Sequence, residues 1–498
     1  MERYDLLVVG GGINGTGIAR DAAGRRLKVL LVEREDLGAA TSSASSKLIH
    51  GGLRYLEQLQ FGLVAEALSE REVLLKTAPH LVRPVRFVMP HVPALRPAWM
   101  IRAGLIGYDY LARRHALEAS RTVDLRTSPY GAGFKSEFGK GFVYSDCAVD
   151  DARLVVATAR AAADLGAAIR PRTACVAVES SEGLWRATLR CEGGRETPVE
   201  ARAIVNATGP WVGEFLANVV RRPAAFGVKL IKGSHIVVPR IYDGEHSCLL
   251  QNEDGRVVFA CAYEGRYTLI GTTDVELRGA PGRCDASTEE VAYLCQAANR
   301  YFMRAVAPAD VVWSYCGVRP LFDDGSANPS AISREYVLRV DAEDGAPPLL
   351  SVVGGKITVF RHLAEKALAA LAPWFPDMPA PWTRHAAFPG GDLRGEPFDQ
   401  FADFHVQRDF PWLPAGVRRA LARRHGALTY EVLGRSTKLT DLGEHFGVEL
   451  YAREIDYFVE REWARTADDV LWRRTKAGLH LDSARRAAVA RYIEQRLS

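Results

Sequence analysis

The sequence predicts an α/β protein in three parts: a parallel-sheet domain that begins at the N-terminus, a strand-rich domain and an all-helical C-terminal domain. Three observations predict this. A strand, a glycine turn, a helix and a second strand fill residues 5–33. Residues 226–345 contain strand-like runs separated by Gly and Asp turns. Residues 400–498 carry helical patterns and no strand runs.

The composition excludes several classes of protein. The 498 residues are 48% hydrophobic and 25% charged, as in globular domains, and the net charge of +4 is too small to indicate a nucleic-acid partner. No apolar run reaches the roughly 18 residues of a membrane span. The N-terminus has no signal-peptide pattern, so we expect an intracellular chain.

The eight cysteines contain no Cys-x-x-Cys pair, and the two that are closest in sequence, Cys284 and Cys295, are 11 residues apart. This spacing does not indicate a zinc ribbon or an iron–sulfur cluster, and we predict no metal site. We expect free, buried thiols.

The first strand, residues 5–9, leads into the glycine turn at residues 10–15, and the apolar strand at 28–33 ends in Glu33. The glycines allow a tight turn and close approach of a pyrophosphate to the N-terminus of the following helix. Glu33 can accept hydrogen bonds from ribose hydroxyls, which argues against the 2′-phosphate of NADP. The unit predicts a dinucleotide site.

Two later segments favour FAD over NAD as the dinucleotide. Residues 204–209 end a strand in small residues, and Gly354-Gly355 form a turn before a helix at 359–371. Such a turn can bring backbone N–H groups against a flavin ring. The cofactor segments are interleaved with other elements, whereas nicotinamide dehydrogenases commonly complete this domain contiguously. Other predicted elements are helices at 64–77 and 150–165 and strands at 168–179, 184–190 and 196–206.

Six segments resemble the signatures of the FAD-dependent glycerol-3-phosphate dehydrogenase family, and most closely its aerobic, quinone-linked bacterial type. They are residues 41–56 (TSSASSKLIHGGLRYL), 206–211 (NATGPW), 231–235 (IKGSH), 269–274 (LIGTTD), 317–320 (GVRP) and 354–358 (GGKIT). The resemblance reaches residues 472–476 (WRRTK), so it covers essentially the whole chain. The anaerobic relatives carry an additional cysteine-bearing C-terminal region, whereas no cysteine follows Cys316 here.

The resemblance implies a glutathione-reductase-like FAD domain, an antiparallel-sheet substrate domain and a helical C-terminal cap. We expect the FAD domain at 1–80, 145–225 and 345–375, the substrate domain at 81–144 and 226–344, and the cap at 390–498. It also implies oxidation of sn-glycerol 3-phosphate to dihydroxyacetone phosphate, with electrons passed from FAD to ubiquinone in respiratory glycerol catabolism. A homodimer, peripheral on the cytoplasmic face of the inner membrane, is expected.

The substrate chemistry assigns roles to particular residues of these segments. A phosphate dianion needs cations, for which Arg54 and Arg319 are the candidates. His235 is the favoured base for the hydroxyl proton, with His50 and Lys356 as alternatives. Lys356 could also stabilise reduced flavin or touch the substrate oxygen. Tyr55 and Thr273 are expected to donate hydroxyl hydrogen bonds to the substrate.

The resemblance also implies a set of FAD-binding residues. It comprises Gly10, Gly12, Asn14, Gly15, Glu33, Thr41, Ser42, Ser45, Ser46, Leu48, His50, Val176, Ala207, Gly209, Gly354, Gly355, Lys356 and Thr358. Two departures from the family concern the geometry of the active site. Ala262-Tyr263 replace a Pro-Trp pair, and Val359-Phe360 replace a Thr-Tyr pair.

A basic, amphipathic segment at 98–114 is predicted to contact an anionic membrane surface, because ubiquinone resides in the bilayer. On a helix, Arg102, Asp109 and Arg113 share one polar face, with Trp99, Ile106 and Tyr110 elsewhere. The alternative interpretation is a core helix with one solvated stripe.

Two rival functions remain at this point. One is an amino-acid or hydroxy-acid oxidase of the same fold, reoxidised by oxygen, in which an arginine would bind a carboxylate. The other is a non-catalytic scaffold, which predicts degenerate cofactor glycines, although the glycines of the turn and Glu33 are intact.

Overall fold

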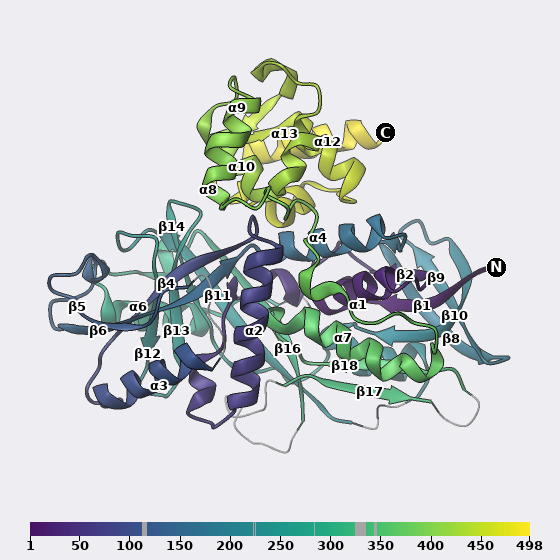
Figure 1. The fold of residues 1–498 in the computed structure, drawn as a ribbon, viewed down its shortest axis with the longest axis horizontal. Helices are drawn as coiled ribbons and strands as arrows, with labels where there is room; N and C mark the ends of the chain where they lie inside the picture. The colour runs from purple at the N-terminus through teal and green to yellow at the C-terminus, as the bar shows by residue number, and fades with distance from the viewer. Residues whose placement is uncertain (112–116, 223, 225, 283, 324–334, 343–345) are drawn as a thin grey trace.

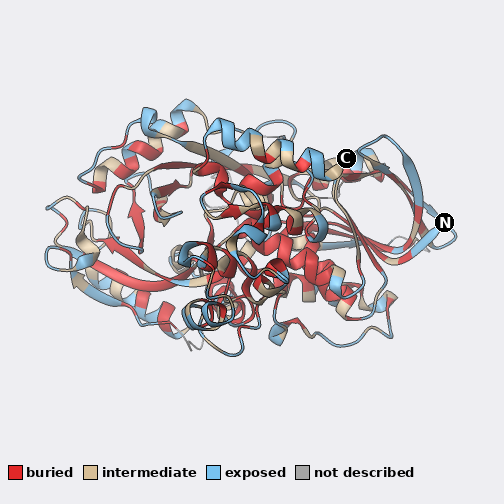
Figure 2. Cartoon of the chain, turned by 90° about the horizontal axis from the view of Figure 1, so that it is seen from above, coloured by how far each residue is buried: buried red, intermediate tan, exposed pale blue. Residues whose placement is uncertain are grey.

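The computed structural model describes residues 1–498 except 112–116, 223, 225, 283, 324–334 and 343–345. Two β-sheets lie side by side and a helical C-terminal domain sits above them (Figure 1). Seen from above, buried residues are concentrated in the strands and the helices packed on them, and exposed residues lie on the outer turns (Figure 2).

The first sheet is mixed, with a parallel centre. Its strands are β1 (Glu2–Val9), β2 (Val29–Val32), β7 (Ala168–Arg170), β8 (Thr173–Ser181), β9 (Leu184–Cys191), β10 (Glu196–Asn206), β17 (Val337–Asp341) and β18 (Leu349–Val353). The order β18-β10-β1-β2-β7 is parallel. β17 adds an antiparallel edge beside β18, and β9 pairs antiparallel with both β10 and β8. The buried apolar runs of β1 and β2 are those expected of parallel strands that are covered on both faces.

Three predicted helices cover this sheet. Helix α1 (Ile13–Gly24) packs against α4 (Asp151–Asp164) and α7 (Phe360–Leu371). The predicted single strand at 168–179 is wrong, because the structure has two strands, β7 and β8. Pro171 lacks a backbone N–H, and Arg172 adopts a positive φ of 53°, so the chain turns between them.

The second sheet is also mixed. Its strands are β3 (Leu48–Ile49), β4 (Val82–Pro90), β5 (Arg121–Asp124), β6 (Lys140–Val149), β11 (Val228–Pro239), β12 (Ser247–Gln251), β13 (Val257–Tyr263), β14 (Tyr267–Gly271), β15 (Val275–Glu276) and β16 (Trp313–Phe322). Its described pairs are antiparallel except β12 with β4, which is parallel.

Helix α6 (Thr288–Tyr301) packs on this sheet and was not predicted. It begins with a capping box, in which the Ser287 hydroxyl accepts from the Glu290 backbone N–H and the Glu290 carboxylate accepts from Ser287 N–H. The Ser-x-x-Glu spacing was a readable signal for this helix.

The C-terminal domain is mainly helical. It contains α8 (Phe398–Gln400), α9 (Gln407–Asp409), α10 (Ala415–His425), α11 (Thr429–Leu433), α12 (Ala452–Arg461) and α13 (Ser483–Leu497), with π-helical turns at Phe401–Val406 and Asp469–Arg474. One short hairpin, β19 (His445–Gly447) with β20 (Leu450–Tyr451), contradicts the expectation of no strands. Buried ion pairs of Arg474 with Asp36 and of Arg153 with Glu462 fasten the domain to the body.

The remaining helices lie beside the second sheet or between the sheets. They are α2 (Phe61–Thr77), confirming the predicted helix at 64–77, α3 (Ala98–Tyr110) and α5 (Val212–Glu214). The expectation of free thiols throughout is wrong at one place, since Cys284 and Cys316 form a disulfide with Cα atoms 5.8 Å apart. The other six cysteines are free, and five of these are buried.

The predicted polar face of α3 is turned inward. The buried Asp109 carboxylate accepts hydrogen bonds from the backbone and hydroxyl of Ser120, at 2.9 and 2.6 Å, and Arg102 donates to the same hydroxyl at 2.7 Å. Trp99 is 70% exposed and Tyr110 80% exposed. Arg113 lies outside the described residues. The helix therefore uses its charged groups to attach to the body and presents aromatic and aliphatic groups to the outside.

Candidate active site

A cavity of about 550 Å³ opens where the carboxyl ends of β1 and β10 face the second sheet. Segments far apart in the chain line it, from the turn after β1 to the turn after β18. In open α/β sheets this edge is the usual place for ligands. The candidate active site is therefore assembled by topology rather than by one local motif.

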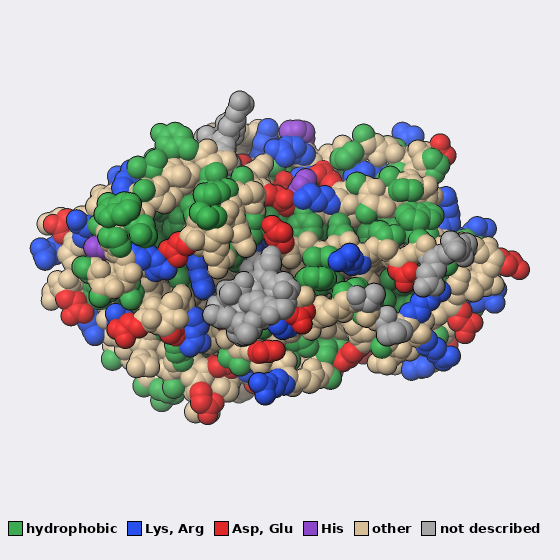
Figure 3. Space-filling model, turned by 90° about the horizontal axis from the view of Figure 1, so that it is seen from below, with side chains coloured by type: hydrophobic (Ala, Val, Ile, Leu, Met, Phe, Trp, Pro, Cys, Tyr) green, Lys and Arg blue, Asp and Glu red, His purple; other side chains and the backbone are tan. Residues whose placement is uncertain are grey.

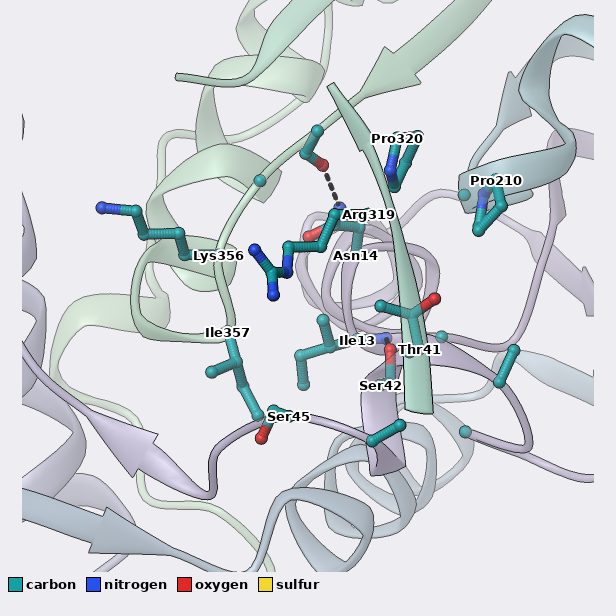
Figure 4. Close-up of a pocket in the computed structure, with 18 of the residues that line it drawn as sticks. Ile13, Asn14, Thr41, Ser42, Ser45, Pro210, Arg319, Pro320, Lys356 and Ile357 are labelled. Carbon is teal, nitrogen blue, oxygen red and sulfur yellow. Dashed lines mark hydrogen bonds between the residues drawn. The ribbon is translucent and has the colours of Figure 1, made fainter. Parts of the chain in front are cut away.

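The glycine turn after β1 forms one wall of the cavity. Gly10 has a φ of +116°, and a Cβ there would lie 2.4 Å from the carbonyl oxygen of Ala207. A Cβ on Gly15 would lie 1.9 Å from the Gly10 carbonyl oxygen. Ser42 Oγ accepts a hydrogen bond from Ile13 N at 3.0 Å, within the first turn of α1 (Figure 4). The turn thus brings the positive end of α1 against the cavity.

Glu33 lines the cavity and holds the glycine turn. Its carboxylate accepts hydrogen bonds from Gly11 N at 2.7 Å and Glu35 N at 2.8 Å. Burial raises the pKa of this carboxyl group. The predicted hydrogen bonds from ribose hydroxyls stay a prediction.

The turn after β18 closes the other side. Asn14 Nδ2 donates to the Gly354 carbonyl oxygen at 3.1 Å, and Asn14 Oδ1 is buried with no partner among the described residues (Figure 4). The Lys356 ammonium lies 3.8 Å from the centre of the Tyr55 ring. Tyr55, Gly355 and Lys356 all line the cavity.

His235 lies on β11 at the wall formed by the second sheet. Its ring stacks on Tyr315 with centroids 4.9 Å apart, and its Nε2 lies 2.9 Å from Ser46 Oγ. Nδ1 is buried without a partner among the described residues. Burial, together with the charges of Arg319 and Lys47, lowers the pKa of His235 well below 6.5. The imidazole is therefore neutral at physiological pH and able to accept a proton.

Two arginines bring positive charge to the cavity. The Arg319 side chain extends from β16 into the pocket on the side where Lys356 lies (Figure 4). Its guanidinium is 2.5 Å from Asp274 Oδ1 and 3.3 Å from Thr272 Oγ1. Arg54 is half-buried in the 3₁₀ turn Leu53–Leu56 and makes no ion pair with any described residue. A phosphate dianion could bind between them.

Three predicted site residues do not line the cavity. Gly15 packs against the Gly10 carbonyl oxygen, behind the glycine wall, and Thr273 and Val176 lie elsewhere. The Thr273 hydroxyl donates to Glu290 of α6 at 2.7 Å and accepts from Ser234 N of β11 at 2.9 Å, so it is engaged between the second sheet and α6. Val176 lies at a register shift in the pairing of β8 with β9. The neighbouring Thr272 and Cys175 line the cavity instead.

The other predicted residues are at or near the wall. Those that line it are Gly12, Thr41, Ser45, Leu48, His50, Ala207, Gly209 and Thr358. Burial and the charge of Lys356 lower the pKa of His50 to about 3, so His50 contributes no charge.

Sequence reasoning missed several functional candidates. Asp274 pairs with Arg319, and Glu290 binds Ser234, Thr273 and Lys232 behind His235. An apolar end of the cavity is formed by Tyr144, Leu249, Val257 and Phe259. Asp274 stood inside the LIGTTD segment, so that segment was its signal.

These residues fit a flavin dinucleotide. The glycine cradle at the N-terminus of α1 suits a pyrophosphate. Asn14 Oδ1, buried without a partner among the described residues, offers an acceptor in the first turn of α1, and the backbone turn at Gly354-Gly355 offers donors on the opposite side. Among the described residues no cluster of His, Cys, Asp and Glu could hold a metal ion.

The described geometry agrees with comparisons to known proteins. The family model described as FAD dependent oxidoreductase matches residues 5–360, and the one described as C-terminal domain of alpha-glycerophosphate oxidase matches 382–497. The aerobic glycerol-3-phosphate dehydrogenase of Escherichia coli is 48% identical over 100% of this chain and 99% of its own. The D-erythritol 1-phosphate dehydrogenase of Brucella abortus is 48% identical over 99% and 98%. The glycerol-3-phosphate dehydrogenase of Bacillus halodurans, solved with FAD, superposes with a TM-score of 0.76 at 26% identity, over 99% and 94%.

Proposed function

Because the chain belongs to the FAD-dependent glycerol-3-phosphate dehydrogenase family, we propose that it oxidises sn-glycerol 3-phosphate to dihydroxyacetone phosphate and delivers the electrons to ubiquinone. The observation that carries the proposal is the meeting of two arginines and a neutral histidine in one cavity beside a dinucleotide cradle. That set suits an anionic alcohol rather than a neutral one.

The residues divide the work as follows. Arg319 and Arg54 bind the phosphate group, and the Asp274 carboxylate orients the guanidinium of Arg319. His235 accepts the hydroxyl proton, and the hydrogen bond between its Nε2 and Ser46 Oγ fixes the ring. Lys356 places positive charge near the reacting oxygen. Bound FAD supplies the hydride acceptor.

An anaerobic spectral titration tests the proposal. Glycerol 3-phosphate is expected to bleach the flavin band near roughly 450 nm, because the hydride reduces the bound cofactor. Glycerol, which lacks the phosphate, is the matched control and should leave the band unchanged. A band that persists with glycerol 3-phosphate but bleaches with an amino or hydroxy acid would overturn the substrate. Hydrogen peroxide formed during aerobic turnover would overturn the quinone as acceptor.

D-Erythritol 1-phosphate is the second candidate substrate, because one relative at 48% identity carries the name of that activity. Like glycerol 3-phosphate, it carries a phosphate group, which the arginines would bind, and a secondary alcohol, whose proton His235 would accept. The ratio of kcat/KM for the two phosphates decides between them, and we expect the three-carbon substrate to be preferred.

The outer face of α3 is proposed to contact an anionic bilayer. Exposed apolar side chains come from α3 and from the start of α2, whose preceding 3₁₀ turn contacts α3: Leu59, Phe61, Trp99, Met100, Ile106 and Tyr110. Hydrophobic groups are visible on the left of the face in Figure 3, where α3 lies. Contiguous exposed apolar groups on a helix favour shallow insertion at a lipid surface. Among the described helices, none has the length and hydropathy of a membrane span.

Replacing Trp99 and Met100 by Ser should release the protein from anionic liposomes and lower ubiquinone-linked activity, while activity with a soluble dye is retained. Phe404→Ser is the control, since Phe404 is 58% exposed on the C-terminal domain. Co-sedimentation with vesicles measures the effect. Undiminished sedimentation of the double variant would exclude this face as the contact.

The finer assignments follow the same proposal. Four of them stay predictions: the set of FAD contacts, the division into FAD, substrate and cap domains, the location on the cytoplasmic face of the membrane, and the homodimer. A mass measurement in solution tests the homodimer, and a structure with bound FAD tests the FAD contacts.

A further inference from the structure

A row of four aromatic rings connects the cavity to the C-terminal domain. His235 stacks on Tyr315 at 4.9 Å, Tyr315 contacts Trp313 at 4.8 Å, and Trp313 stacks on Trp472 at 4.9 Å, all between ring centroids. Trp472 belongs to the π-helical turn Asp469–Arg474, within the family-like segment WRRTK, to which no role has been assigned. The row is a direct side-chain route from that domain to His235.

Strand register explains the first part of the row. Strands β11 and β16 are antiparallel and pair His235 with Tyr315 and Val237 with Trp313. Trp313 and Tyr315 are two residues apart, so both point to the same face of the sheet as His235. Side chains directly opposite in an antiparallel pair interact closely.

The other flank of His235 faces the backbone of a glycine rather than a side chain. Its partner on β14 is Gly271, where a Cβ would lie 2.1 Å from Cδ2 of the imidazole. No side chain can stand there, so lateral support for the ring comes from Tyr315. Ser46 restrains only the Nε2 end of the imidazole.

Trp472 is held firmly relative to both sheets. Arg473 and Arg474 pair with the buried Asp36, beside the wall that carries Glu33. Asp469 pairs with Arg172 at 2.7 Å. Tyr267 of β14 donates to the Leu479 carbonyl oxygen at 2.9 Å, a second contact of the same domain that bypasses the aromatic row.

We propose that Trp472 of the C-terminal domain is a positioning residue for His235, acting through Trp313 and Tyr315. The ring of Trp472 fixes Trp313, Trp313 restricts Tyr315, and Tyr315 keeps the imidazole over Gly271 in one orientation. The proposal rests on the proposed function only in taking His235 as the base. It gives the helical domain a part in the chemistry although no residue of 390–498 lines the cavity.

Charged groups face His235 from several elements. Its own strand β11 brings Lys232, which pairs with Glu290 of α6. β16 brings Arg319, the segment before β3 brings Lys47 paired with Asp151, and β14 brings no charged group at the register position. If the packing of the four aromatic rings is loosened, water can reach His235, but the neighbouring charged side chains stay in place. Hydration favours the protonated ring, so the acidic limb of the pH profile should move to higher pH.

The test compares FAD-loaded Trp472→Leu with Trp472→Phe and Tyr267→Phe. In dye-linked assays Trp472→Leu should lower kcat about three- to tenfold, with KM little changed and the acidic limb of kcat/KM raised. Trp472→Phe should restore most of the activity. Tyr267→Phe, which weakens the same domain contact without touching the row, should behave as wild type. Trp472→Met replaces the leucine variant if the latter loses FAD.

A second readout does not depend on activity. Carbethoxylation of His235 by diethyl pyrocarbonate, followed by peptide mass mapping, should be faster in Trp472→Leu and unchanged in Tyr267→Phe. A wild-type modification rate with an unshifted pH profile would overturn the proposal, even where the thermal midpoint falls. If modification is faster but His235→Asn retains activity, the positioning stands and the role of His235 as base fails.

Discussion

His235→Asn is expected to lower kcat for glycerol 3-phosphate oxidation by about 10²- to 10⁴-fold, the range for loss of a positioned general base. KM should change little, because the asparagine side chain keeps a hydrogen-bonding group and the phosphate contacts are elsewhere. Stopped-flow reduction of the bound flavin measures the step directly. His50→Asn is the matched control, since His50 lines the same cavity and should cost less than about tenfold. A larger loss in His50→Asn or Lys356→Met would move the base to that residue.

The pH dependence follows from the same histidine. The pKa of His235 lies well below 6.5 because the ring is buried and faces Arg319 and Lys47. A base must be unprotonated, so kcat/KM should stay level through neutrality and fall only at pH below the usual histidine range. The same depressed pKa opposes stability at low pH, because the unfolded chain binds a proton at 6.5 that the folded chain does not.

Arg319→Gln is expected to lower kcat/KM by about 10²-fold or more, since hydrogen bonds to charged groups contribute about 1.5–3 kcal/mol each and the fork makes two. It should also lower the thermal midpoint, because Asp274, with a side chain 9% exposed, loses its guanidinium partner. Arg54→Gln should reduce kcat/KM by about 10- to 100-fold with no loss of stability, since Arg54 has no described ion pair to lose.

Steady-state kinetics and thermal unfolding on the same preparations separate the two arginines. Asp274→Asn, which keeps a hydrogen-bond acceptor beside Arg319, is the control for orientation. Equal stability of the Arg319 and Arg54 variants would contradict the assignment of Asp274 as the structural partner of Arg319.

The parts of the fold that were predicted are those with a strong local signal. The unit from β1 to β2 combines buried apolar runs with glycines whose Cβ atoms would clash, so sequence and structure agree there. Helices α2, α4 and α7 and strands β9 and β10 follow plain periodic patterns. FAD followed from the interleaving of segments, and the family comparison confirms it.

The misses arise where tertiary contacts decide. The spacing of Arg102 and Asp109 on α3 suggested a solvent-exposed polar face. In the structure both side chains bind Ser120, and helical periodicity within α3 cannot indicate a partner outside the helix. The Cys284–Cys316 disulfide forms because the fold brings the segment that carries Cys284 next to β16. The spacing of cysteines in the sequence does not indicate that contact. The hydroxyl of Thr273 was expected at the substrate, but the unpredicted helix α6 brings Glu290 to bind it.

The hydrogen bond from Asn14 to Gly354 joins positions 340 apart in the chain. Strand β1 likewise pairs with β10, formed by residues 196–206. During synthesis the glycine turn therefore leaves the ribosome long before β10 and the Gly354 turn. Until these segments are made, it lacks the partners with which it forms the dinucleotide site. Loading of FAD is consequently a late event that follows translation of most of the chain. Because a ligand that binds only the native state stabilises it by mass action, cofactor supply will set how much newly made chain is retained.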